Sequence, residues 1–158
     1  MDWDAIGAFG EILGALAVLI TLFYLGRQIK QNTQEIRSSN YHGITDSFNA
    51  LNVVVATDAE VARIFDAGNL SYSNLPASEQ TRYAYLLHAA LRVWDVLYYQ
   101  SHNDTGDKTL WDAERQSLEI MLRPKGAREW WRSRPFRFSA DFESYVESVV
   151  ISNIEGGR

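Results

Sequence analysis

An apolar segment near the start of the chain, residues 5–26, constrains the fold more than any other feature. As an α-helix, a segment of about 22 residues is roughly 33 Å long, which matches the hydrocarbon core of a bilayer. Its only carboxylate is that of Glu11, and it contains no Lys, Arg or His. We therefore expect residues 1–26 to form a transmembrane anchor.

Two other kinds of segment could produce the same pattern. A signal peptide has a basic n-region, a short apolar core and a cleavage site between small residues. Here Asp2 and Asp4 precede the segment, no Lys or Arg does, and the apolar run is longer than such a core. The second alternative is a buried helix of a soluble protein, because Glu11 lowers the hydropathy. Length and composition favour the membrane span.

The charges on either side of the span predict its orientation. Arg27, Lys30 and Arg37 follow the span, where Glu35 is the only acid, whereas only acids precede it. Because positive residues stay on the cytoplasmic side, the N-terminus should lie outside and the C-terminal part in the cytoplasm. The absence of cysteine is compatible with a reducing compartment.

The remainder of the chain has the composition of a folded, all-α domain. Hydrophobic residues make up 46% of the sequence and aromatic residues 13%, and there are only three prolines. Apolar residues recur at helical spacings from Ile29 to Val55 without a proline, so one helix should run from about residue 4 to residue 56, with Gly43 as the place for any bend. We expect residues 27–56 to continue the anchor helix and residues 57–158 to form a cytoplasmic helical bundle.

The bundle should contain several shorter helices, whose ends are predicted by caps and turns. Thr57 and Glu60 have the spacing of a capping box, and Gly68 should end that first helix. Further helices are expected at 76–101, at 109–122, around Trp130 and Trp131, and after an N-cap at Ser139. Residues 101–108 form the clearest turn. The inward residues of the last helix should be Phe142, Tyr145, Val146, Val149 and Val150.

One face of the apolar helix differs from the rest. Counting in steps of four and three residues gives the seam, which consists of Gly7, Glu11, Gly14, Val18, Thr21, Leu25 and Gln28. The seam contains the span's only carboxylate and its only aliphatic hydroxyl, whereas the opposite face carries Phe9, Leu13, Leu16, Ile20 and Phe23. A 3.5-residue repeat keeps one face of a helix against a partner over many turns. Gly10 and Gly14 also form a GxxxG pattern, which permits close helix contact.

Glu11 makes assembly of several chains the favoured hypothesis. An ionised carboxylate inside a bilayer costs several kcal/mol unless it is paired, hydrated or protonated. A single-pass chain has no second helix to supply a partner. Glu11 is therefore protonated and hydrogen-bonded between subunits, or lines a wet axis for ions or protons, or meets a basic group of another protein.

A second cluster of charge lies at 123–137. Its basic residues are Arg123, Lys125, Arg128, Arg132, Arg134 and Arg137, against the single acid Glu129. The candidate partners of this basic segment are anionic lipid head groups, a phosphate ligand or an acidic protein, and Trp130 and Trp131 would suit a membrane interface. The structural alternative is that the arginines pair with acidic helices of the same domain. Nucleic acid is not expected as a partner of an acidic chain with a net charge of −5 and no known binding module.

No catalytic residue, metal site or cofactor is predicted. The three histidines share no metal-ligand spacing, and no P-loop, GxSxG, HExxH or dinucleotide-binding glycine pattern occurs. His88, Arg92, Asp95 and Tyr99 fall on one helical face, as either a buried polar network or a small-ligand site. An enzyme that uses this face is the third and least favoured functional hypothesis.

Four segments, in this order along the chain, carry a resemblance to a known family. They are GAFGEILGALAVLITLFYLGRQIKQNT, DAEVARIF, RVWDVLYYQ and AREWWRSRPFRFSADFESYV. The chain resembles an uncharacterised bacterial family of small, membrane-anchored helical proteins without an established activity. The resemblance implies a location in the bacterial inner membrane, and it places Glu11 and the Trp130–Trp131 pair in segments typical of the family.

Together these features predict a non-enzymatic, single-pass membrane protein that forms a homo-oligomer through its first helix. Copies of that helix would surround or seal a central axis. If the axis is an open channel, Glu11 would line it. The rival hypothesis is an accessory or scaffold subunit that docks the same face on a larger bacterial membrane complex.

Overall fold

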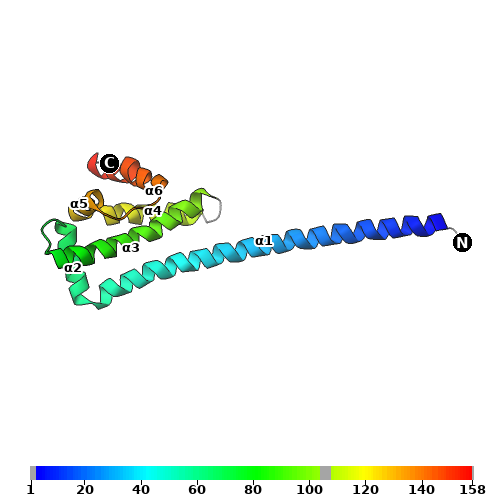
Figure 1. The fold of residues 1–158 in the computed structure, drawn as a ribbon, viewed down its shortest axis with the longest axis horizontal. Helices are drawn as coiled ribbons and strands as arrows, with labels where there is room; N and C mark the ends of the chain where they lie inside the picture. The colour runs from blue at the N-terminus through cyan, green and yellow to red at the C-terminus, as the bar shows by residue number, and fades with distance from the viewer. Residues whose placement is uncertain (1–2, 104–107, 158) are drawn as a thin grey trace. The chain divides into compact units, whose positions relative to one another are not determined.

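The chain is all-α, with a long apolar N-terminal helix followed by a helical domain (Figure 1). The structure is a computed structural model that describes residues 3–103 and 108–157, and the side chains from Gly7 onward. No strand occurs in those residues. The predicted fold class is thus confirmed.

Helix α1 spans Trp3–Thr57 and passes through Gly43 without interruption. The chain divides into two compact units, residues 1–39 and residues 40–158, so that α1 belongs to both. Hydroxyl groups along α1 donate to the carbonyl four residues earlier, as Thr21 does to Ala17 (2.8 Å) and Thr33 to Ile29 (2.9 Å). These bonds satisfy polar side chains within the helix and leave no need for a partner at those positions.

Helix α2 covers Ala59–Leu70, and its ends differ from the predicted ones. The N-cap is Asp58, whose carboxylate accepts hydrogen bonds from the backbone N–H groups of Glu60 (2.9 Å) and Val61 (3.1 Å). Thr57 is the last residue of α1, and its hydroxyl donates back to the carbonyl of Val53, so it does not cap α2. The predicted capping box at Thr57 is therefore wrong by one residue. Gly68 is also wrong as a helix end, since it is buried inside α2.

Helices α3 (Ala77–His102), α4 (Lys108–Leu122) and α5 (Lys125–Ser133) form the centre of the domain. Helix α3 packs against α2, α4 and the later helix α6 (Ala140–Tyr145), while α5 packs against α2 and α4. The buried side chains of α3 follow helical spacing, and they include Tyr83, Leu87, Ala90, Leu91 and Trp94. The predicted turn at 101–108 lies partly outside the described residues.

The C-terminal segment begins as predicted but then changes its helical pitch. Ser139 caps α6 (Ala140–Tyr145) by accepting from the N–H of Phe142. A π-helical segment, η1 (Val146–Ile151), follows and leads into α7 (Ser152–Glu155). A π-turn contains an extra residue, which rotates the inward face. Val149 is consequently exposed and Ile151 is buried, contrary to the prediction for Val149.

Trp130 and Trp131 are fully buried in the core of the domain. The indole N–H of Trp131 donates to Glu147 Oε1 (2.6 Å), and the Trp131 ring stacks on Phe138 at a centroid distance of 5.6 Å. The suggestion that this pair suits a membrane interface is therefore wrong, because neither ring reaches the surface.

Candidate functional site

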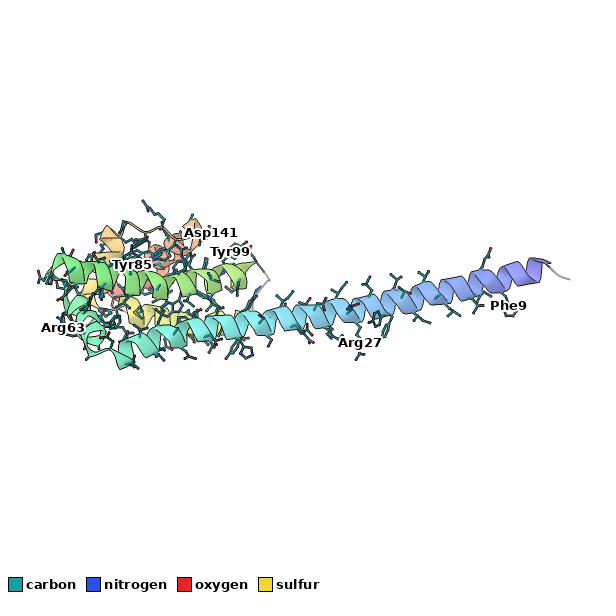
Figure 2. All side chains as sticks on the ribbon, turned by 60° about the horizontal axis from the view of Figure 1, so that its bottom comes forward. Phe9, Arg27, Arg63, Tyr85, Tyr99 and Asp141 are labelled. Atoms are coloured by element: carbon teal, nitrogen blue, oxygen red, sulfur yellow. The ribbon has the colours of Figure 1, made fainter. Side chains whose placement is uncertain are left out.

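The seam residues lie on an apolar helical surface that no other part of the described chain covers. All of residues 7–39 are exposed, and the exposed fraction reaches 71% for Phe9 and 76% for Phe23. Figure 2 shows the side chains of Phe9 and Arg27 projecting from the helix. One helix in the described residues, α1, is long and apolar enough to cross a membrane, and none of its most apolar window is buried. This exposure disfavours the alternative of a buried core helix.

The seam also has room for close contact with another helix. A Cβ atom added at Gly7, Gly10 or Gly14 would meet nothing within 4 Å. Thr21 already donates its hydrogen to its own helix, whereas the Glu11 carboxylate makes no hydrogen bond or ion pair with any described residue. Glu11 is thus the seam residue whose polar group most needs an external partner.

Every cation of the basic segment pairs with a carboxylate of its own domain. The pairs are Arg123 with Glu119 (3.5 Å), Lys125 with Glu129 (3.3 Å), Arg128 with Glu155 (3.6 Å), Arg132 with Glu155, Arg134 with Glu143 (3.1 Å) and Arg137 with Glu143 (3.5 Å). This geometry favours the structural alternative for the segment over a dedicated anion site. Most of these pairs are exposed, so each contributes little stability by itself.

Arg134 differs from these exposed pairs because its side chain is largely buried in the core of the domain. Its side chain is only 9% exposed, and its guanidinium carbon lies 3.4 Å from the centre of the Trp131 ring. Glu143, its ion-pair partner, also accepts from the backbone N–H of Phe138 (3.0 Å). That backbone bond, followed by Arg134, holds the pKa of Glu143 below its usual value. Arg134 therefore couples α5 to α6 through both stacking and charge.

The predicted polar face of α3 forms a network that ties α3 to the segment before α6. Asp95 is buried, pairs with Arg92 (2.7 Å) and accepts from both the hydroxyl (2.5 Å) and the N–H of Ser139. Arg92 also donates to the backbone carbonyl of Arg137 (2.7 Å). Of the two alternatives for this face, the contacts favour the structural network, because the polar groups of Arg92 and Asp95 are occupied by the protein itself.

The two remaining residues of that face behave differently. The ring of His88 stacks on Phe136 at a centroid distance of 4.1 Å, and its Nε2 lies 3.4 Å from Arg92 Nη2. Burial, with the nearby Arg92 charge, lowers the pKa of His88. Tyr99 is 60% exposed and has no part in the network (Figure 2). No group of three or more His, Asp or Glu side chains in the described part of the chain is placed to hold a metal ion.

A cavity of about 660 Å³ is a feature that the sequence analysis missed. It lies within residues 40–158, between the last turns of α1 and helices α2, α3 and α4. Asn49, Asn52, Trp94 and Glu114 are among the residues that line it. Four separate helices supply this lining, so no spacing within one segment could reveal it.

Comparison of the chain with protein-family models, with curated proteins and with solved structures finds no match.

Proposed function

We propose that this chain is a single-pass membrane protein that self-assembles through the seam of α1 and has no catalytic role. The observation that carries the proposal is the apolar N-terminal part of α1, which is exposed from Gly7 to Ser39 and contains a carboxylate, Glu11, without a partner among the described residues. Large apolar side chains such as Phe9 and Phe23 are unfavourable in water, at roughly 25 cal/mol per Å² of exposed surface. Lipid would cover them without further protein.

The seam gives the reason for self-assembly rather than simple anchoring. Lipid cannot satisfy the carboxylate of Glu11, whereas the same residue of a second copy can share a proton or a hydrogen bond with it. Gly7 and Gly14 flank Glu11 on the seam and leave open space for a neighbouring backbone. Copies of α1 would then surround an axis lined by Gly7, Glu11, Gly14 and Thr21.

We place the protein in a bacterial inner membrane, with the N-terminus outside and the helical domain in the cytoplasm. The cations Arg27, Lys30 and Arg37 after the span support this orientation. Because the chain contains no cysteine, single cysteines at residue 2 and at Asn153 give a clean test. A membrane-impermeant maleimide should label the first variant and not the second in intact cells. The reverse pattern would overturn the orientation.

The same exposed face also suits a different function, namely an accessory or scaffold subunit of a larger membrane complex. Native mass spectrometry of the full chain, extracted in a mild detergent, separates the two functions. Self-assembly predicts complexes whose masses are multiples of 18.0 kDa. A complex with a different protein would favour the scaffold function, and a monomer alone would contradict both.

A further inference from the structure

The cavity between α1 and the other helices of the domain has the properties of a ligand site. Its volume of about 660 Å³ falls in the range typical of small-molecule sites, which is roughly 300 to 1,000 Å³. All its lining residues belong to the compact unit 40–158. Its lining includes exposed side chains, among them Tyr41 and Ile120, so the site opens to solvent and a ligand can reach it from outside.

The cavity exists because α1 touches the domain through few side chains. Within α1, Ile44 is the one buried residue of the described side chains, while Phe48 and Leu51 are half-buried against the core. Phe48 lies 4.8 Å from Trp94, measured between ring centroids. The aromatic walls of the cavity are completed by Phe65 and Tyr41. A ligand with an apolar body would bury surface that the protein leaves half-exposed.

The polar groups of the cavity indicate the charge of the ligand. Glu114 is the only charged residue of the lining, and its carboxylate has no hydrogen bond or ion pair with any described residue. The amides of Asn49 and Asn52, on the wall contributed by α1, likewise make no hydrogen bond within the described residues. Aromatic faces and a carboxylate together attract a cation, and they disfavour an anion.

We propose that this cavity binds a small primary amine with an apolar body. Its ammonium group pairs with Glu114, its apolar part packs between Phe48, Phe65 and Trp94, and the two asparagines accept or donate hydrogen bonds at the rim. The site does not depend on the seam or on self-assembly, because every residue that forms it belongs to the helical domain.

Three probes of similar size test the proposal: 4-phenylbutylamine, 4-phenylbutanol and 4-phenylbutanoate, which share the phenylalkyl body and end in an ammonium, a hydroxyl and a carboxylate group. We would titrate each into the full chain in a maltoside detergent by calorimetry and subtract titrations into detergent alone. The amine should bind about tenfold more tightly than the alcohol, which corresponds to one charge-assisted hydrogen bond, and the carboxylate should bind most weakly. Equal affinity for all three probes, or no binding above the detergent blank, would overturn the proposal.

Glu114→Gln supplies the decisive variant. Trp94 donates to the backbone carbonyl of Glu114 (3.2 Å), so this substitution keeps the structural contact and removes only the charge. It should reduce amine binding to the level of the alcohol and leave the alcohol unchanged. Asp112→Asn is the matched control, because it removes an exposed carboxylate of the same helix outside the cavity. An equal loss of amine binding in both variants would overturn the role of Glu114.

A lipid head group could also supply the ammonium. Adding phosphatidylethanolamine to the detergent micelles distinguishes the two sources. A free amine as the ligand predicts unchanged binding of 4-phenylbutylamine. Competition by the lipid would overturn the assignment to a free amine.

Discussion

Gly126 lies directly against the backbone of Gly68, so that a Cβ atom on Gly126 would overlap the carbonyl oxygen of Gly68. Both glycines are buried, and they are the point where α5 and α2 meet. On its other side, Gly68 faces the ring of Tyr83, which a Cβ atom on Gly68 would also overlap. Three helices therefore share one contact that only glycine allows.

Gly126→Ala should destabilise the domain by about 3 kcal/mol or more, because the backbone of Gly68 and Tyr72 must move away from α5 to admit the methyl group. Gly43→Ala is the control. It lies in α1 with no atom within 4 Å of an added Cβ, and alanine should be neutral or stabilising by up to about 1 kcal/mol. Chemical denaturation of the full chain in detergent measures both. Wild-type stability of Gly126→Ala would contradict the close packing.

Arg134 and Arg137 pair with the same carboxylate, Glu143, from opposite environments. The side chain of Arg134 is 9% exposed and that of Arg137 is 83% exposed. Arg134→Gln should cost about 2 to 3 kcal/mol, since it removes the stack on Trp131 and leaves Glu143 poorly paired. Arg137→Gln should cost less than about 0.5 kcal/mol. Equal losses in the two unfolding curves would show that burial does not decide the effect.

His88 should make the domain less stable as the pH falls. Burial and the Arg92 charge lower its pKa from the ordinary value of 6.5, so the unfolded chain binds the proton more readily than the folded one. The stabilising contribution is present above pH 6.5 and is lost as the pH falls below it. His88→Gln should flatten the fall in melting temperature between about pH 7.5 and 5.5. An unchanged slope in this variant would contradict the effect.

Much of the fold could be predicted because it depends on short-range patterns. Apolar residues at helical spacing located α1 and α3, and the side-chain cap located the start of α6 at Ser139. The cap at Asp58 was missed because both Thr57 and Asp58 are common capping residues and Thr57 has, in addition, the capping-box spacing to Glu60. The fold distinguishes the two residues: Asp58 accepts from the first N–H groups of α2, whereas the Thr57 hydroxyl bonds back to Val53.

Features that depend on contacts between distant segments could not be predicted. Gly68 resembles a helix end in the sequence, but the approach of Gly126 explains why glycine is needed inside α2. The burial of Ile151 in place of Val149 depends on the π-helical segment, which has no signal in the sequence. Two acidic partners of the basic segment, Glu143 and Glu155, lie later in the chain. Only the folded structure shows that they pair with its arginines.

Glu11 separates assembly from conduction. Glu11→Gln keeps the shape and a hydrogen-bond donor, so it should preserve assembly and abolish any ion or proton flux across proteoliposomes. Glu11→Leu should weaken assembly only modestly, since hydrogen bonds inside membranes average under about 2 kcal/mol. Absence of flux in the wild-type protein, with intact assembly, would mean that the axis is sealed. Loss of assembly in Glu11→Gln would show that assembly requires the carboxyl group itself and not only a polar side chain of that shape.

The most direct test of the central claim is energy transfer between separately labelled full-length chains in liposomes at increasing protein-to-lipid ratio. Self-assembly through the seam predicts a saturating transfer signal that Gly14→Leu reduces more than either Glu11 variant does. Gly26→Leu, the same substitution off the seam and also in open space, should leave the signal unchanged. A signal that only rises in proportion to crowding, or equal effects of the two glycine variants, would contradict self-assembly through this face.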